Sequence, residues 1–183
     1  MSLPLAAGSW IIDPVHSAVQ FSVKHLGIST LRGRFADVAA SVEVGDDLGS
    51  SSLAATIGMG SIDTGNADRD GHVRSSDFFN AEVNPKMSFT SAKIEQKEDG
   101  SYQVSGPLSL NGVSKDTTLD VMFFGTEDNP FDGSHRAGFA ATGQIDRTDF
   151  GIEWNVPLPS GGVMLGKKVD ISIDAQFLAP TGE

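Results

Sequence analysis

The chain has 183 residues, of which 39% are hydrophobic and 20% are charged, a composition typical of one globular domain that buries about 70% of its unfolded surface. The formal net charge of −11 opposes binding to nucleic acid or to anionic lipid surfaces, because both need a basic protein face. The absence of cysteine excludes a disulfide framework, a thiolate nucleophile and a zinc–thiolate site. We therefore expect one soluble domain over residues 1–183 that binds no nucleic acid.

The N-terminal stretch and the hydropathy of the chain bear on its location. Residues 1–8 contain no basic residue, and the apolar run over 3–7 is interrupted by Pro4 and too short for the apolar core of a signal peptide. No stretch approaches the ~18 to 20 continuous apolar residues that a membrane-spanning helix needs. The sequence therefore predicts a cytoplasmic protein with no integral membrane segment.

Alternation of apolar and polar residues recurs along the first third of the chain and predicts strands with one buried face each. Residues 10–12 form a short first strand. A second follows, with inward positions at Val19, Phe21, Val23 and His25. Further strands are predicted over 38–44 and 53–62. Small residues in the last of these, Ala54, Gly58 and Gly60, predict that another segment packs closely on its second face.

Hairpins dominate the rest of the chain. Asp99-Gly100 and Asn111-Gly112 favour the positive φ angles of tight turns, so strands over 86–96, 102–110 and 114–124 are predicted to pair in sequence. A long loop over 126–135, a strand near 137–145, a flexible loop over 157–166 and a last strand over 169–177 complete the chain. Eight or nine such strands fit a closed antiparallel barrel or a two-sheet sandwich, and the pattern does not separate the two.

The stretch 66–79 is the one part that resembles neither strand nor turn. Its acids fall at EF-hand spacing, but the first ligand position holds Asn66 instead of Asp and the last holds Asp77 instead of Glu. We prefer a short helix in which Asn66 is the N-cap and Asp70 faces Arg74 one turn later. The residues predicted to pin this helix to the barrel are Phe78 and Phe79.

Candidates for chemistry are sparse. The four histidines lie far apart and form no His-x-His or His-x₃-His pair, so no metal site is predicted. His25 shares the inward parity of the second strand, which leaves two interpretations open: a core histidine bonded to a backbone carbonyl, or a polar group touching a ligand. No Gly-x-Ser-x-Gly nucleophile motif occurs. The acids nearest to aromatic residues are interpreted as turn formers or solvated charges: Asp13, Asp146, Asp149 and Glu153.

Six sequence blocks occur in fixed order: WIIDPVHS at 10–17, FSVKHLG at 21–27, RGRF at 32–35, RDGHVRSSDFF at 69–79, NGV at 111–113, and residues 143–151. Together they resemble the YceI-like, lipocalin-like proteins over about residues 10–177. The resemblance implies an all-β fold, an extended eight-stranded antiparallel lipocalin-like barrel with its core at about 10–178 and one short helix near a mouth. It also implies binding of polyisoprenoid chains or other long amphiphiles, with no catalytic residue, metal or cofactor assigned. Many relatives carry a signal peptide, which residues 1–8 do not resemble.

The working hypothesis is a non-enzymatic barrel whose apolar pore sequesters or carries a long isoprenoid or acyl ligand, with the ligand head near the mouth. The predicted ligand-binding residues are Phe21, Val23, His25, Phe35, Met59, Arg69, His72, Arg74, Phe78, Phe79, Phe89, Val121, Phe123, Phe139 and Trp154. Two alternatives stay open: an enzyme for a small hydrophobic substrate with Asp149 or His25 as acid–base group, and a stress-related interaction protein whose own side chains fill the barrel. A homodimer is one expectation for the assembly.

Overall fold

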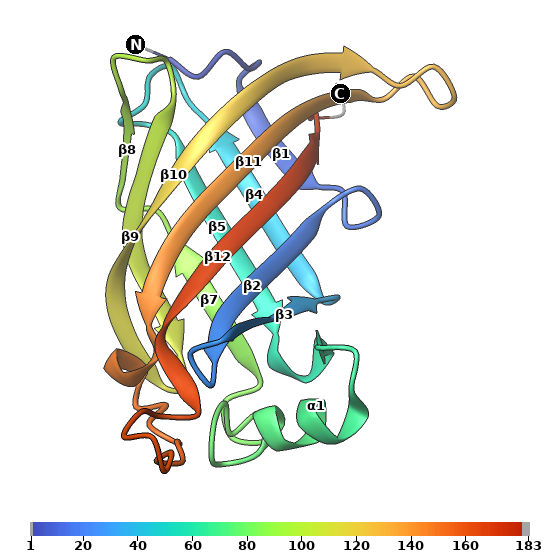
Figure 1. Ribbon diagram of the computed structural model, residues 1–183. Helices are drawn as coiled ribbons and strands as arrows, with labels where there is room; N and C mark the ends of the chain where they lie inside the picture. The colour runs from blue at the N-terminus through green and yellow to red at the C-terminus, as the bar shows by residue number, and fades with distance from the viewer. Residues whose placement is uncertain (1, 181–183) are drawn as a thin grey trace.

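The computed structural model describes residues 2–180 and contains twelve strand segments in one antiparallel sheet, which closes into an eight-stranded barrel (Figure 1). Closure occurs at β1 (Gly8–Ile12), which pairs with β4 (Val38–Val44) on one side and with the end of β12 (Leu165–Leu178) on the other. The predicted barrel is confirmed, and the sandwich alternative is excluded because β1 pairs with both β4 and β12 and so closes the sheet on itself.

The sheet order is β1-β4-β5-β7-β9-β10-β11-β12-β2-β3-β6, with β8 paired to β9. The remaining strands are β2 (Ala18–His25), β3 (Ser29–Phe35), β5 (Ser52–Gly58), β6 (Ile62–Asp63), β7 (Lys86–Thr90), β8 (Lys93–Gln96), β9 (Tyr102–Leu110), β10 (Val113–Asp128) and β11 (His135–Asp146). Both predicted turns have the expected backbone: φ is 85° at Gly100, 52° at Asn111 and 74° at Gly112.

The strand predicted over 53–62 is wrong in its second half. The strand β5 ends at Gly58, whose N–H donates to the Asp37 carbonyl at 2.9 Å, and a 3₁₀ helix, Met59–Ser61, leads into β6. A Cβ at Gly58 would collide with the Asp37 side chain, so the prediction of close packing is confirmed there. The prediction of close packing fails at Gly60, where a Cβ would meet no atom within 4 Å.

The strand predicted over 86–96 is divided into β7 and β8, which pair with the same strand, β9, in registers that differ by one residue. At this irregularity the Thr90 carbonyl lies so close to Gly106 that a Cβ there would overlap it, and the Ala92 N–H donates to the Ser105 carbonyl at 2.8 Å. Strand β10 also extends to Asp128, which shortens the predicted loop over 126–135 to residues 129–134.

The barrel wall is incomplete along one edge of β3. One side of β3 pairs with β2 along its length, whereas the other pairs only at Arg34 and Phe35 with the two-residue β6, among the residues described. The helix α1 (Ala67–Arg74) lies below this edge (Figure 1). This part of the wall is therefore closed by side chains of α1 and its flanking loops instead of by a strand.

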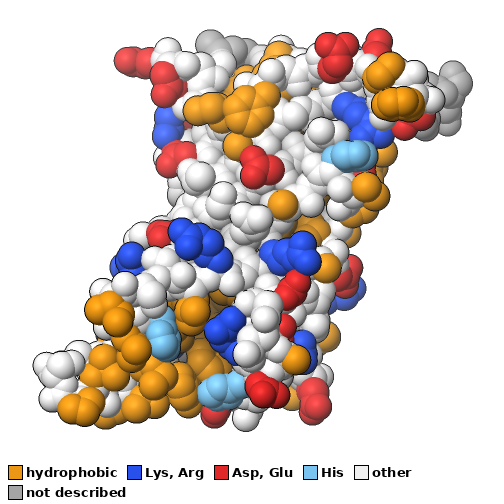
Figure 2. All heavy atoms as spheres, turned by 45° about the vertical axis from the view of Figure 1, so that its right-hand side comes forward, with side chains coloured by type: hydrophobic (Ala, Val, Ile, Leu, Met, Phe, Trp, Pro, Cys, Tyr) orange, Lys and Arg blue, Asp and Glu red, His pale blue; other side chains and the backbone are white. Residues whose placement is uncertain are grey.

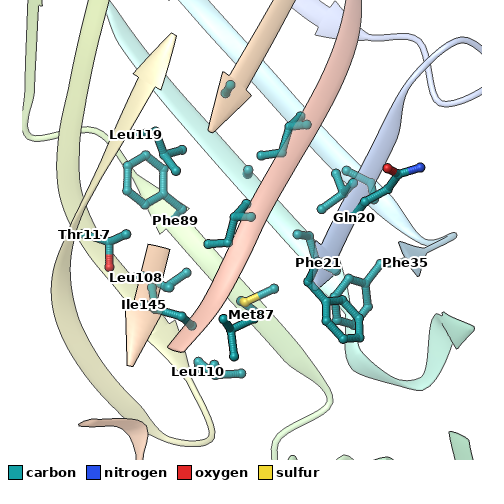
Figure 3. Close-up of a pocket in the computed structure, with 18 of the residues that line it drawn as sticks. Gln20, Phe21, Phe35, Met87, Phe89, Leu108, Leu110, Thr117, Leu119 and Ile145 are labelled. Atoms are coloured by element: carbon teal, nitrogen blue, oxygen red, sulfur yellow. The ribbon is translucent and has the colours of Figure 1, made fainter. Parts of the chain in front are cut away.

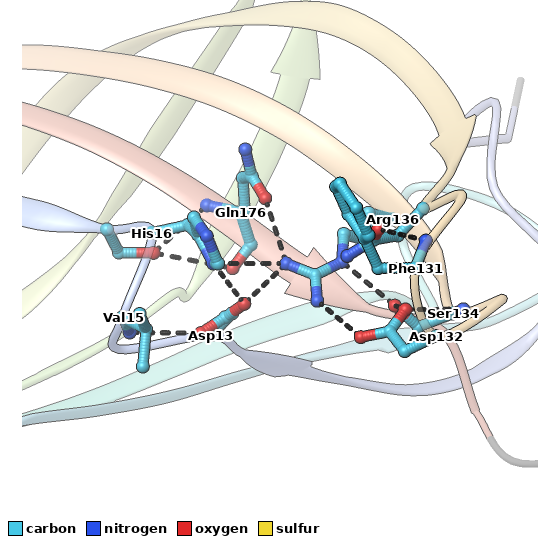
Figure 4. Close-up of polar contacts among 10 residues, drawn as sticks. Asp13, Val15, His16, Phe131, Asp132, Ser134, Arg136 and Gln176 are labelled. Carbon is cyan, nitrogen blue, oxygen red and sulfur yellow. Dashed lines mark hydrogen bonds and ion pairs between the residues drawn. The ribbon is translucent and has the colours of Figure 1, made fainter.

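A buried ion pair joins the break between β1 and β2 to strand β11 (Figure 4). The Asp13 side chain is 9% exposed, and its carboxylate accepts a hydrogen bond from Arg136 Nη1 at 2.6 Å and lies 2.8 Å from His16 Nδ1. Arg136 also donates to Asp132 at 3.1 Å and to Gln176 at 3.3 Å. The interpretation of Asp13 as a turn former is confirmed, because its Oδ1 accepts a hydrogen bond from the Val15 N–H at 2.9 Å. The sequence did not show that the same carboxylate also pairs with Arg136.

No helix among residues 2–180 has the length and apolar character needed to cross a membrane.

Candidate functional site

The inward faces of the strands enclose a cavity of about 490 Å³ (Figure 3). Its walls are almost wholly apolar, and in the middle of the barrel Phe89, Leu108, Leu119 and Ile145 point into it. The Thr117 hydroxyl is a rare polar group at that level, and it donates to the Lys115 carbonyl at 3.4 Å. The interior is therefore suited to a chain of CH₂ or isoprene units and offers little to a polar ligand.

The cavity runs between the two ends of the barrel. At one end Leu3 from the N-terminal segment packs with Tyr102 and Phe177, and Trp10 fixes this segment by donating from Nε1 to the Ala6 carbonyl at 2.9 Å. At the other end the lining residues are Leu110, Ile152, Trp154, Leu165 and the side chains around α1. The cavity thus extends along the barrel axis instead of forming a shallow surface pocket.

Helix α1 is positioned by the cap that the sequence predicts. The Asn66 side chain accepts a hydrogen bond from the Arg69 N–H at 2.9 Å, which confirms Asn66 as N-cap. The predicted contact between Asp70 and Arg74 is wrong: Asp70 is 9% exposed and instead accepts hydrogen bonds from the Thr64 N–H at 2.9 Å and hydroxyl at 2.6 Å. These two hydrogen bonds tie the first turn of α1 to the chain that follows β6.

The two phenylalanines after α1 hold this end of the barrel together. The Phe78 ring, 8% exposed, packs on Trp154 with ring centroids 5.2 Å apart, and Phe79 packs on Phe35 at 6.2 Å. His72 stands edge-on to both Phe78 and Trp154. Its Nε2 lies 2.8 Å from the Asp77 carboxylate. Because Asp70 and Asp77 have these separate partners, they do not converge on one point as EF-hand ligands do.

Replacing both Phe78 and Phe79 with leucine is expected to loosen this end and to speed release of a bound chain about tenfold or more, while the barrel stays folded. Leucine keeps most of the buried apolar area but loses the ring contacts to Trp154 and Phe35, whereas alanine would cost about 3–5 kcal/mol of stability at each site. Release of a fluorescent prenyl probe, followed by stopped flow, measures the rate. A matched control, Val83→Leu, changes an exposed residue nearby; release unchanged in the Phe variant would show that these rings do not gate the cavity.

Polar groups border the cavity beside the incomplete wall of β3. The Arg69 guanidinium is held there by hydrogen bonds from Nε to the Thr64 hydroxyl and from Nη2 to the Thr64 carbonyl, both 2.7 Å. His25 and Arg32 line the same part of the cavity. Within residues 2–180 the His25 imidazole has no hydrogen-bond partner, so it lacks the backbone carbonyl that one of the two interpretations requires. Donors that could meet a ligand head are thus placed at the rim.

The cavity is lined by every predicted ligand-binding residue except Arg74 and Phe123. These two residues do not line the cavity, and their binding of a ligand remains a prediction. Arg74 is in the last turn of α1, and Phe123 packs behind Phe139 with ring centroids 5.1 Å apart. The prediction missed many aliphatic and small lining residues that share the inward parity of their strands, among them Leu31, Ala55, Leu108, Leu119, Ala141 and Ile173.

Sequence reasoning also missed Arg147, a buried cation at the α1 end of the cavity. Its guanidinium is 4% exposed and donates to the carbonyls of Ile152 at 2.7 Å and Gly166 at 2.9 Å. Burial lowers the pKa of Arg147, and the nearby Asp146 carboxylate opposes that shift. Asp146 caps the following 3₁₀ helix, Arg147–Phe150, by accepting from the Thr148 N–H at 3.0 Å, which confirms its interpretation as a turn residue. The exposed Asp149 lies in that helix.

Comparison with known proteins agrees with this architecture. The model of the YceI-like domain family matches residues 10–177. A UPF0312 protein of Staphylococcus epidermidis is 43% identical over 167 residues, covering 90% of this chain and 94% of its own. The Campylobacter jejuni YCEI protein is 30% identical and superposes with a TM-score of 0.70, covering 86% of this chain and 90% of its own.

A structure with lower sequence identity shares the same fold. It is a polyisoprenoid binding domain from Saccharophagus degradans, 18% identical, with a TM-score of 0.66 and coverage of 93% of this chain and 98% of its own. The family match over nearly the whole barrel agrees with the residue blocks in the sequence. This chain belongs to the family of YceI-like domains.

Proposed function

We propose that the protein binds a long-chain isoprenoid, or an amphiphile of similar shape, inside the barrel and sequesters or carries it without chemical change. The observation that carries this proposal is the cavity itself: about 490 Å³ and almost wholly apolar, with few charged groups in its lining, namely Arg32, Arg69 and Arg147. The structural similarity to a polyisoprenoid binding domain supports an isoprenoid over an unrelated apolar ligand.

The energetics of such a cavity depend on chain length. Each CH₂ group moved from water into an apolar site contributes about 0.8 kcal/mol. A slim chain is therefore bound by length and shape with few polar contacts, and the head group adds a smaller contribution through Arg69, Arg32 or His25 at the rim. The enzyme alternative gains no support from Asp149, which is exposed and lies outside the cavity lining.

The expected result of a titration with prenyl alcohols of increasing length is a stepwise rise in affinity. Each added five-carbon unit should tighten Kd by at least about tenfold, because it buries several further CH₂ equivalents, until the cavity is full and the affinity levels off. Fluorescence competition against a prenyl probe measures the series. Affinity independent of chain length, or no binding at any length by folded protein, would contradict the proposal.

A further inference from the structure

The basic residues of this acidic protein are unevenly distributed. Two segments, 14–36 and 154–169, contain no Asp or Glu although the chain as a whole carries a net charge of −11. They hold five of the thirteen Lys and Arg residues: Lys24, Arg32, Arg34, Lys167 and Lys168. The overall charge, which opposes attraction to an anionic surface, therefore does not describe this part of the molecule.

The fold brings these two segments together at one end of the barrel. Strand β12 pairs with β2, with Leu165 opposite His25 and Val169 opposite Val23. The Leu26 N–H donates to the Met164 carbonyl at 2.7 Å, which joins the β2–β3 turn to the loop before β12. In Figure 1 this turn and this loop lie together at the lower end of the barrel.

Apolar side chains are exposed on these joined tips. The exposed fraction is 84% for Ile28 and 49% for Val163, with Leu26 and Val156 also exposed. Figure 2 shows apolar side chains gathered at the lower left of this face, with basic and histidine side chains beside them. We call the four residues Leu26, Ile28, Val156 and Val163 the docking tip. Clustered exposed apolar side chains of this kind mark interaction sites.

The cations around the docking tip are largely free to meet an external anion. Arg34 is paired with Asp63 at 2.9 Å and Lys168 with Asp146 at 3.5 Å. Among residues 2–180, Lys24, Arg32 and Lys167 have no ion-pair partner. An apolar tip surrounded by free cations is complementary to a membrane with anionic headgroups, which attracts each nearby Lys or Arg and accepts apolar side chains beneath it.

The docking tip is continuous with the end of the cavity. The cavity is lined by residues one or two positions from the docking tip in sequence, namely His25, Trp154, Met164 and Leu165. We propose that the docking tip seats shallowly on an anionic lipid membrane, so that a long apolar ligand passes between the bilayer and the cavity without crossing water. This inference rests on the proposed function for its purpose, but attachment to a membrane is a separate property with its own measurement.

The test is flotation of the full chain with vesicles made of equal parts phosphatidylglycerol and phosphatidylcholine, and with pure phosphatidylcholine. We expect binding to the anionic vesicles that weakens with salt. Replacing Ile28 and Val163 together with serine should weaken it at least about tenfold, and replacing Lys24 and Lys167 together with glutamine about twentyfold at low ionic strength. None of these four residues lines the cavity.

The matched controls are Phe131→Ser, at a 96% exposed residue of the β10–β11 loop, and the pair Lys93→Gln with Lys97→Gln near the β8–β9 turn. Both should bind vesicles like the parent protein. Three results would overturn the inference. One is equal vesicle binding by all variants, and another is no vesicle binding by the folded protein. The third is that the Ile28 and Val163 variant loses a dimer while no vesicle binding is seen. Uptake of a short water-soluble prenyl alcohol without vesicles separates the two proposals, since its failure rejects the ligand and leaves membrane attachment standing.

Discussion

Replacing Ala141 with phenylalanine is expected to weaken binding of a long apolar chain about 200-fold while the barrel stays folded. Ala141 lines the cavity on β11, opposite Val121 on β10 and Ile173 on β12. A benzyl group there would occupy space that the ligand needs. Displacing about four CH₂ groups, at about 0.8 kcal/mol each, corresponds to about 3 kcal/mol or a roughly 200-fold rise in Kd.

The control for this variant is the neighbouring Ala140→Phe, which points to the other face of the same strand and does not line the cavity. It should bind the chain like the parent protein. Thermal unfolding of both variants adds a second readout. If the barrel were filled by its own side chains, Ala141→Phe would overpack a solid core and cost about 1–3 kcal/mol of stability. A stability loss of that size together with unchanged ligand binding would contradict an open cavity.

Replacing Asp13 with alanine is expected to lower the free energy of unfolding by about 2–3 kcal/mol at neutral pH. The substitution leaves the Arg136 guanidinium, whose side chain is 15% exposed, without its closest carboxylate. Removing one member of a largely buried, hydrogen-bonded ion pair leaves the other charge desolvated, which costs more than the loss of a surface pair. Urea denaturation at pH 7 measures the difference.

The pH dependence of this effect has a definite sign. Burial alone would raise the pKa of Asp13, but the hydrogen bonds from His16 and the Val15 N–H, together with the charge of Arg136, lower it below the ordinary value of 3.8. Because the pKa of Asp13 is lower in the folded state, its ionised carboxylate stabilises the fold at pH values above the ordinary pKa. This contribution is lost as the pH falls through the lowered pKa. The difference between parent and Asp13→Ala should therefore shrink in acid.

A matched control is Asp128→Ala. In the parent protein the Asp128 carboxylate pairs with His135, but the Asp128 side chain is 73% exposed. Exposed pairs contribute about 0–1 kcal/mol, so this variant should be nearly as stable as the parent at pH 7. An Asp13 variant no less stable than the Asp128 variant would show that the Asp13–Arg136 pair does not stabilise the junction between β1, β2 and β11.

Local signals in the sequence were sufficient for much of the fold. Alternation located the inward face of β2, the Asn111-Gly112 pair located a hairpin, and Asn66 located the start of α1. The breaks in strands were not predictable, because they depend on neighbours distant in sequence: the Asp37 carbonyl accepts the Gly58 N–H, and the Thr90 carbonyl lies against Gly106.

The site was predictable to the extent that parity along a strand gives the inward face. Large residues such as Phe89 were therefore recognised, whereas Ala141, small and inward, carried no signal of its own. Asp13 and Arg136 are 123 residues apart, so nothing local showed that this turn former also pairs with a largely buried cation. Whether the barrel was hollow could not be known from the sequence either, because a filled core and an apolar cavity use the same residues.

Mass spectrometry of the purified protein shows directly whether the barrel holds a long apolar chain. The protein should be analysed intact under native conditions and again after extraction with organic solvent, before and after incubation with a long-chain prenyl alcohol. We expect one bound chain per barrel in the incubated parent protein and none in Ala141→Phe. Folded parent protein that carries no lipid on purification and takes up none on incubation would show that the barrel does not bind such a chain.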